Sequence, residues 1–488
     1  MHNNMFDTDV QLLKNKVLSQ VARHAFEDSL DPLSVMGISR EIIPDEAEPT
    51  MRCCIYKERA IVDERVKLAM GGDPEKTAIV QVLPIACDEC PVDGMTVTGN
   101  CRGCLAHRCI NACPKNAIVF GPDHKAHIDK ALCINCGRCK DACPYSAIVK
   151  RTRPCMNACK ANALSTDSKT SKAVISEEKC ISCGQCVYQC PFGAIVDRSF
   201  ITKVIDILKK SQDNTKYHVY AVVAPAIASQ YDTIPGMNTE KAVSGIKMLG
   251  FHSVIEAAWG GDMVAYMEAM ELVEKGFLTS SCCPAFVNFI HKNYPTIVPD
   301  ISSNPSPMVQ MGKVLKQMDP GSKVIFIGPC IAKKDEYLRN TEHIDAVLTF
   351  EELQALFDSR DIDISQLEGT PLDNASYFGR IFARSGGLCE AVAEALAERG
   401  IPEDQFKADP IVCNGLAECN KALLMKKVGR LKNNFIEGMC CEGGCIGGPA
   451  AINHNPKDAN EVTKYGKTAV EQTIKSAISV LDGFGEEN

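Results

Sequence analysis

The chain has 488 residues, too many for one ordinary domain, so we expect about two to four domains. Its formal net charge of −8 argues against nucleic acid as a partner and leaves small soluble partners open. The 27 cysteines fall mostly in short repeated motifs, which indicates a carrier of metal clusters in a reducing, cytoplasmic compartment and excludes a secreted disulfide scaffold. No signal peptide is expected. The longest apolar run, 219–228, is too short to cross a membrane, so no membrane association is predicted.

The first 80 residues predict a helical N-terminal segment. Apolar residues recur at helical spacing over 9–26 and over 60–70, before Gly71-Gly72 ends the pattern. Cys53 and Cys54 lie between these helices. As sequence neighbours they are expected to point apart, and nothing nearby completes a metal site, so we interpret them as structural or spare.

Residues 81–198 predict a cluster-binding domain, because 16 cysteines fall between positions 87 and 190. Two runs follow the pattern Cys-x-x-Cys-x-x-Cys-x-x-x-Cys-Pro, starting at Cys133 and at Cys180. Three close thiolates on a tight loop can bind three corners of a [4Fe–4S] cube, while the fourth cysteine serves the neighbouring cluster. Cys-x-x-Cys pairs also bind zinc, but the third cysteine at the same step followed by Cys-Pro favours the cube.

An internal repeat extends this pattern to four sets of four cysteines. Cys109-Ile-Asn-Ala-Cys113 precedes the first run, and Cys155-Met-Asn-Ala-Cys159 precedes the second. The proposed sets are Cys101, Cys104, Cys109 with Cys143; Cys133, Cys136, Cys139 with Cys113; Cys87, Cys90, Cys155 with Cys190; and Cys180, Cys183, Cys186 with Cys159. The third set bridges a long gap, and the alternative is that only two or three clusters form. Four closely spaced clusters would form an electron-transfer chain.

Beyond a linker helix within 199–216, strand-like and helix-like segments alternate. The predicted strands are 219–223, 254–256, 324–327 and 346–349, and helices are predicted at 263–275 and 308–318. This alternation indicates α/β layers with largely parallel sheets, whose ligand loops usually follow the strands. A single C-terminal helix, 459–481, is expected within residues 456–488.

Three cysteine loops stand out in the second half of the chain. They are Ser280-Ser281-Cys282-Cys283-Pro284, Gly328-Pro329-Cys330-Ile331-Ala332-Lys333, and Glu437-Gly438-Met439-Cys440-Cys441-Glu442-Gly443-Gly444-Cys445. Glycine lets the backbone approach a bulky inorganic group. A flexible turn with chance cysteines is the alternative for the last loop alone, but three such loops at element ends can converge on one cluster.

Together these loops resemble the signature of [FeFe]-hydrogenases, in the order of that family, over residues 217–450. The resemblance implies a ferredoxin-like α+β cluster domain followed by a two-lobed α/β domain, 217–455, that holds the H-cluster. Phe286 stands where the best-known members have Trp, and Gly328 stands where they have Met, which suggests a divergent subgroup. Four further cysteines have no assigned role, although buried small side chains are the simpler interpretation; they are Cys389, Cys413, Cys419 and Cys440.

By this resemblance Cys283, Cys330, Cys441 and Cys445 would hold the [4Fe–4S] part of the H-cluster. Its two-iron part carries CO, cyanide and a dithiolate bridge. Cys282 would be the proton-donating thiol. Lys333 would hydrogen-bond a cyanide ligand, although a solvated lysine at a helix start is the alternative. Ser281 and Met439 would line the cofactor, and Glu336 would orient the lysine loop.

A buried metal that reacts with protons needs a proton relay. Glu268 and Glu271 are three apart on a predicted helix, on one face, and resemble the relay glutamates of the family. Ser302 or Ser303 would link them. An ordinary acidic helix face is the alternative.

The resemblance therefore implies reversible reduction of protons to H2. Electrons would pass between a ferredoxin and the H-cluster through the N-terminal clusters, and maturation proteins would supply the two-iron cofactor. The alternatives are a non-catalytic relative that serves in cluster assembly, a redox or H2 sensor, and a pure electron-transfer subunit. The last leaves the three loops unexplained.

Overall fold

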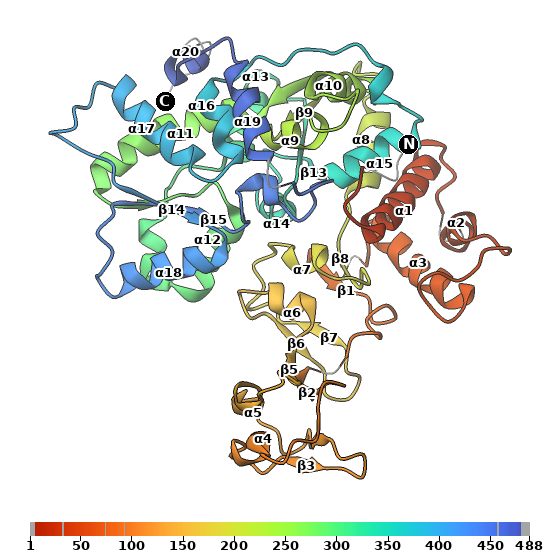
Figure 1. Ribbon diagram of the computed structural model, residues 1–488. Helices are drawn as coiled ribbons and strands as arrows, with labels where there is room; N and C mark the ends of the chain where they lie inside the picture. Colours follow the sequence, from red (N-terminus) through yellow and green to blue (C-terminus); the bar gives the residue numbers. More distant parts are fainter. Residues whose placement is uncertain (1–4, 32–33, 74, 92, 456–457, 480–488) are drawn as a thin grey trace.

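The computed structural model describes residues 5–31, 34–73, 75–91, 93–455 and 458–479. A mixed α/β body carries a narrow arm made of residues from about 80 to 198 (Figure 1). No helix among these residues is long and apolar enough to cross a membrane. The N-terminal helices lie on the body beside the base of the arm (Figure 1).

The N-terminal segment is helical, as predicted, but it packs on the body. It consists of α1 (Asp9–Phe26), α2 (Ser34–Ile42) and α3 (Ile55–Ala69). Thr8 caps α1, because its side chain accepts a hydrogen bond from the Gln11 amide at 3.2 Å. The prediction that Cys53 and Cys54 point apart is wrong, since their sulfurs lie 3.9 Å from each other. Cys54 is the N-cap residue of α3 and has an extended backbone, with φ of −164° and ψ of 159°.

The arm is built from four small antiparallel pairs of strands. The pairs are β1 (Val80–Val82) with β8 (Ile195–Asp197), β2 (Gly94–Val97) with β5 (Ile148–Arg151), β3 (Ile118–Phe120) with β4 (Ala126–Ile128), and β6 (Leu164–Thr166) with β7 (Ala173–Ile175). Short helices alternate with them: α4 (Arg108–Asn111), α5 (Arg138–Ala142), α6 (Pro154–Ala158) and α7 (Gln185–Tyr188). The distal part contains β2 to β5, and the part next to the body contains β6 to β8 (Figure 1).

The body contains two parallel sheets. The four-stranded sheet has the order β10 (Ser253–Glu256), β9 (Val219–Val223), β12 (Lys323–Gly328), β13 (Ala346–Thr349), so all four predicted strands are confirmed. The three-stranded sheet has the order β11 (Leu278–Thr279), β15 (Phe435–Met439), β14 (Pro410–Asn414). Its strands were not among the predicted ones, because β11 has only two residues and β15 runs directly into the glycine-rich loop.

Helices connect and cover these sheets. They are α8 (Ile201–Lys210), α9 (Ala228–Tyr231), α10 (Thr239–Met248), α11 (Ala257–Lys275), α12 (Pro284–Asn293), α13 (Pro307–Met318), α14 (Ala332–Leu338), α15 (Phe350–Ser359), α16 (Tyr377–Arg380), α17 (Gly387–Glu398) and α18 (Leu416–Lys427). The linker helix is α8, and α1 packs against α8 and α15. The predicted helices at 263–275 and 308–318 lie within α11 and α13, which pack against each other.

The single C-terminal helix predicted at 459–481 is wrong. The chain forms α19 (Asp458–Lys467) and α20 (Ile474–Ser479), separated by a non-helical stretch, and positions 480 and 481 lie outside the described residues. The break follows from tertiary contacts. The amides of Ile474 and Lys475 at the start of α20 donate to Glu398 at 2.8 and 2.6 Å, which gives that helix its own capped start on α17.

A buried ion network ties the three parts of the chain together. Lys334 on α14 is fully buried and contacts Asp197 at the base of the arm at 2.7 Å and Glu352 on α15 at 2.9 Å. Lys14 on α1 contacts the same Asp197 and also Glu351, both at 2.6 Å. Because each ion has its partners inside the protein, the network fixes how the arm and α1 sit on the body.

Candidate metal-cluster site

The three cysteine loops follow strands of both parallel sheets. Cys283 precedes α12 shortly after β11, and Cys441 and Cys445 follow β15 of the same sheet, while Cys330 follows β12 of the four-stranded sheet. Loops at the carboxyl ends of the strands of the two sheets therefore meet at this site. Burial raises the pKa of Cys330 to about 11 and that of Cys445 to about 12, with Cys283 close enough to both to add to the shift. Cys441 interacts with the other three.

The four thiols fit a cluster better than a single ion. Among the described residues, no group of three or more His, Cys, Asp or Glu side chains is close enough to hold one metal ion. Four half-buried cysteines within electrostatic reach of one another, but too far apart for one ion, suit a larger iron–sulfur cube. Burial raises the pKa of Cys330, Cys441 and Cys445, whereas a hydrogen bond with Cys440 lowers the pKa of Cys283 to about 7. The positive charge of a bound cluster would hold the first three as thiolates.

Lys333 lies beside this site, buried and paired. Its ammonium donates to Glu336 at 2.7 Å and to the carbonyl of Cys282 at 3.3 Å. Burial works against its charge, but Glu336 leaves the pKa of Lys333 raised above its usual value. The alternative of a solvated lysine at a helix start does not hold for this structure. Cys282 is buried too, and burial together with Glu268 raises the pKa of its thiol far above the usual range.

The two glutamates of α11 are joined through one hydroxyl. Ser302 Oγ donates to Glu271 at 2.8 Å and lies within hydrogen-bond reach of Glu268. Ser303 contributes its backbone amide to Glu271 at 2.9 Å. Of the two serines named from the sequence, Ser302 therefore provides the linking side chain. Glu268 Oε2 is buried without a hydrogen-bond partner among the described residues.

The two carboxyl groups have opposite pKa shifts. Burial raises the pKa of Glu268 to about 7, against the hydrogen bonds from Ser302 and Ser281. Burial acts in the same direction on Glu271, but hydrogen bonds from Lys275, Ser302 and Ser303 outweigh it and lower the pKa. Paired groups whose environments separate their pKa values are typical of acid–base relays, and Glu268 can take up or release a proton near neutral pH.

Ser281 and Met439, predicted to line the cofactor, each lie two residues before a candidate ligand cysteine. Ser281 Oγ donates to the Asn304 carbonyl at 2.7 Å and contacts Glu268 at 3.3 Å. Met439 is buried at the end of β15 and packs in the same apolar cluster as Cys282. Phe286 lies against Gly438, where a Cβ atom would come within 2.2 Å of the ring. Only glycine fits there.

Electrostatic interactions in the arm link cysteines that belong to the same proposed set. One cysteine of each set shows this: Cys109 interacts with Cys143 and Cys104, Cys139 with Cys133 and Cys113, Cys155 with Cys190, Cys90 and Cys87, and Cys186 with Cys183, Cys180 and Cys159. The third set therefore comes together in spite of its long sequence gap. β1 and its following turn return along the base of the arm to bring Cys87 to the second repeat.

A backbone feature of these sets was missed from the sequence. The last cysteine of each repeat accepts a hydrogen bond from the amide of the alanine four residues later, at 3.2 to 3.4 Å; the pairs are Cys113 with Ala117, Cys143 with Ala147, Cys159 with Ala163 and Cys190 with Ala194. The residue before each alanine has φ near +50°, and these are Asn116, Ser146, Asn162 and Gly193. The signal is the recurrent Cys-x-x-[Asn/Ser/Gly]-Ala, since such residues tolerate the left-handed region.

The arm meets the body at the cluster site. Gln185 at the start of α7 donates to Cys441 Sγ at 3.4 Å and to the Gly447 carbonyl at 3.5 Å. Cys183 is close enough to Cys283 and Cys441 to interact electrostatically with both. The proximal set of the arm is therefore the one that faces the body site. Gln185 was not identified from the sequence, because only the docking of the arm gives it a partner.

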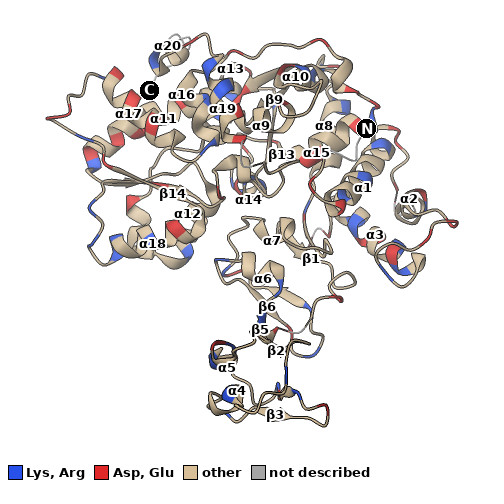
Figure 2. Ribbon diagram, in the orientation of Figure 1, with Lys and Arg blue, Asp and Glu red and all other residues tan. Residues whose placement is uncertain are grey.

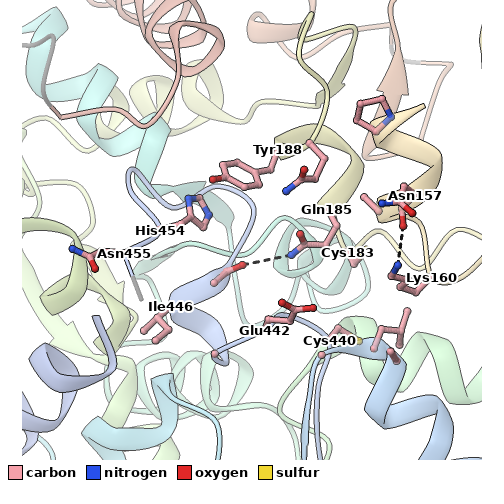
Figure 3. Close-up of a pocket in the computed structure, with 18 of the residues that line it drawn as sticks. Asn157, Lys160, Cys183, Gln185, Tyr188, Cys440, Glu442, Ile446, His454 and Asn455 are labelled. Atoms are coloured by element: carbon pink, nitrogen blue, oxygen red, sulfur yellow. Dashed lines mark hydrogen bonds between the residues drawn. The ribbon is translucent and has the colours of Figure 1, made fainter. Parts of the chain in front are cut away.

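A cavity of about 830 Å³ lies along this junction (Figure 3). Cys183, Gln185 and Tyr188 line it from the arm, and Cys440 and His454 line it from the body. The Tyr188 and His454 rings pack with their centroids 4.0 Å apart. The cavity therefore approaches the proximal cluster and the body site from the same side.

Three family models match parts of the chain. Residues 217–449 match the iron-only hydrogenase large subunit, C-terminal domain. Residues 100–147 match a 4Fe-4S dicluster domain, and residues 173–196 match a 4Fe-4S binding domain. The chain thus combines iron–sulfur domains with a hydrogenase-like C-terminal domain.

Individual relatives fall into two functional groups. Iron hydrogenase 1 of Clostridium pasteurianum is 29% identical over 69% of this chain, which spans 66% of that relative, just under two thirds of its length. Cytosolic iron-sulfur assembly component 3 of Mus musculus is 23% identical over 54% of this chain and 68% of its own length. The solved structure of [FeFe]-hydrogenase HydA1 from Chlamydomonas reinhardtii is 20% identical, covers 58% of this chain and 94% of its own, and has a TM-score of 0.49.

Proposed function

We propose that the protein is an [FeFe]-hydrogenase that reduces protons to H2 reversibly. One observation carries the proposal: the four converging cysteines share their site with a buried thiol at Cys282, a paired ammonium at Lys333 and the glutamate pair of α11. A protein that only carried a cube would have no use for these three features. Cys283, Cys330, Cys441 and Cys445 would hold the [4Fe–4S] part of the H-cluster.

When bound, the two-iron part of the H-cluster supplies an open metal position at which H2 is formed or split. The side chains of the protein supply the proton and exclude water from the site. Cys282 is a buried thiol with a raised pKa and so carries a proton at neutral pH. Lys333, fixed by Glu336, offers a compact cation to a small anionic ligand.

Protons move between Cys282 and the surface along α11. Glu268, with its pKa of about 7, exchanges a proton with Cys282 on one side and with the Ser302 hydroxyl on the other. Ser302 passes the proton to Glu271, which is paired with the half-exposed Lys275 at 2.7 Å. General acid–base transfer requires groups within hydrogen-bond reach, and the step from Ser302 to Glu271 at 2.8 Å meets this requirement.

Electrons would travel through the arm. Its four cysteine sets, two in the distal part and two in the part next to the body, would hold [4Fe–4S] clusters that exchange electrons with the body site. The contact of Cys183 with the body cysteines supports this order. The electrostatic neighbours of Cys186 include Cys155, so the two proximal clusters are adjacent.

The distal part of the arm suits an acidic electron-carrier protein such as a ferredoxin. Residues 94–151 contain nine Lys and Arg residues against three Asp and Glu, in a chain whose net charge is −8 (Figure 2). Large apolar side chains are exposed there as well: Leu105, Val119, Leu132, Ile134 and Tyr145. An excess of basic residues together with exposed apolar groups fits a transient partner of opposite charge.

The second candidate function is a non-catalytic role in iron–sulfur cluster assembly, as the name of the mouse relative describes for that protein. This role needs the cubane cysteines but not Cys282, Lys333 or the glutamates of α11. The burial and pairing of these side chains favours the enzyme.

The test is isotope exchange by protein produced anaerobically with hydrogenase maturation proteins. Under D2 in ordinary water, the enzyme forms HD and H2 without any external electron carrier. The Cys282→Ala variant keeps its iron but loses exchange. Iron-loaded, matured protein without exchange would refute the proposal and favour the assembly role.

A further inference from the structure

Three cysteines without an assigned role form a buried cluster behind Cys283. Cys413 on β14, Cys419 on α18 and Cys440 at the end of β15 are 1%, 0% and 6% exposed. They pack in one apolar cluster with Phe286, Leu416, Leu423 and Ile436, and Cys283 packs against the same cluster. Three separate elements bring these thiols together.

The thiols are within hydrogen-bond reach of one another in a row. Cys419 Sγ contacts both Cys413 and Cys440, and Cys440 Sγ also contacts Cys283. Cys419 donates its proton to the Met439 carbonyl at 3.5 Å. A thiol has one proton to give, so the Cys419 sulfur can only accept from its neighbours.

Cys440 therefore has two possible acceptors for its single proton. One is the neutral sulfur of Cys419, and the other is Cys283, which is a thiolate when it binds iron. A hydrogen bond to a charged acceptor is about twice as strong as one between neutral groups, and burial strengthens it further. The proton of Cys440 goes to Cys283.

We propose that Cys440 is a positioning residue that donates its S–H to the Cys283 sulfur and sets the reduction potential of the cube in the body, with Cys419 holding it in place. The inference rests on the ligand role of Cys283 in the proposed function. A reduced cube carries one more negative charge, so a hydrogen bond to its ligand sulfur stabilises the reduced form and raises the potential.

The test is a redox titration, followed by electron paramagnetic resonance, of full-length protein made without maturation proteins, so that only cubes are present. Cys283→Ala first identifies which couple belongs to the body site. We expect Cys440→Ala to lower the reduction potential of that couple by ~59 mV, which for one electron is a tenfold change in the ratio of reduced to oxidised cube. The couples of the arm serve as internal controls and stay unchanged.

Two further variants separate hydrogen bonding from packing. Cys440→Ser keeps a donor and restores most of the potential. Cys413→Ala, the same change two thiols away from Cys283, leaves the couple in place.

An unchanged potential in Cys440→Ala with full iron content would overturn the proposal. So would loss of one cube in Cys440→Ala but not in Cys441→Ala, because Cys440 would then be a ligand itself. The outcome does not depend on H2 turnover. The proposed function would be refuted if the unaltered, matured protein failed the isotope exchange test. The role of Cys440 would still stand if Cys440→Ala lowered the reduction potential of the body cube.

Discussion

Gln185 Nε2 donates to Cys441 Sγ at 3.4 Å, so the first residue of α7 in the arm touches a cysteine of the body site directly. Cys183, two residues earlier, belongs to the proximal set of the arm. The arm and the body thus meet at the two cysteine sets between which the proposed function requires an electron to pass.

The closeness of this junction depends on Gly184. Its φ is +79°, and a Cβ atom would lie 2.6 Å from Ile331 and 2.8 Å from Pro449. Gly184→Val must push the arm away from the body. We expect arm-fed H2 production to fall at least about tenfold, while isotope exchange, which needs no external electrons, is kept. Gly137→Val is the matched control, because that glycine has φ of +83° but no atom within 4 Å of its Cβ position. Equal losses in both variants would mean that backbone strain, and not the junction, matters.

The buried ion network around Lys334 predicts a large loss of stability on removal of its charge. Lys334→Met leaves Asp197 and Glu352 without their shared partner, and breaking such a buried pair costs about 3–5 kcal/mol. Anaerobic denaturant unfolding measures this. Lys210→Met removes an exposed pair with Asp206 and should leave the unfolding midpoint unchanged. A Lys334 variant as stable as the unaltered protein would show that the network does not hold the parts together.

Glu268 predicts a dependence of stability on pH. Its pKa is about 7 in the folded protein against an ordinary value of 4.5, so the stabilisation from the protonated form is complete below pH 4.5 and is lost as pH rises through 7. Glu268→Gln removes this dependence. Between pH 5 and pH 8, the unfolding free energy of the unaltered protein should therefore fall by on the order of 3 kcal/mol relative to that of the variant. A difference that is flat with pH would refute the raised pKa.

The basic distal arm predicts salt-sensitive electron delivery. Arg138→Glu combined with Lys140→Glu, two exposed positions beside the distal clusters, should slow H2 production from an acidic ferredoxin roughly tenfold at low ionic strength. High salt should reduce the difference in H2 production between the variant and the unaltered protein, because it screens exposed charges. A small-molecule reductant should show no difference. Lys407→Glu, an exposed lysine of the body, is the control. A rate that is indifferent to the arm charges would place the docking surface elsewhere.

The sequence predicted those parts of the fold that have a local pattern. Helical spacing identified α1, and buried apolar runs identified β9, β12 and β13. The strands β14 and β15 were missed, because β14 is only partly buried and β15 ends in a motif whose glycines mask its pattern. The break between α19 and α20 depends on Glu398, which is far away in the sequence.

The candidate site shows the same division. Cysteine spacing predicted four sets in the arm, and the loop motifs predicted which cysteines hold a cluster in the body; both assignments of cluster ligands stay predictions. The sequence could not show that Ser302, and not Ser303, provides the linking hydroxyl. Nor could it show that Cys440 lies against Cys283 or that Gln185 reaches Cys441, because both contacts arise from the packing of elements distant in the chain.

The infrared spectrum of matured, anaerobic protein tests the central claim most directly, since iron-bound CO and cyanide absorb where proteins do not. We predict these bands in protein produced with maturation proteins, and we predict that they shift under H2 and are absent when Cys283 or Cys445 is replaced by alanine. Fully iron-loaded protein that shows no such bands after maturation would contradict the account, and the cluster-assembly role would then be the better explanation of this site.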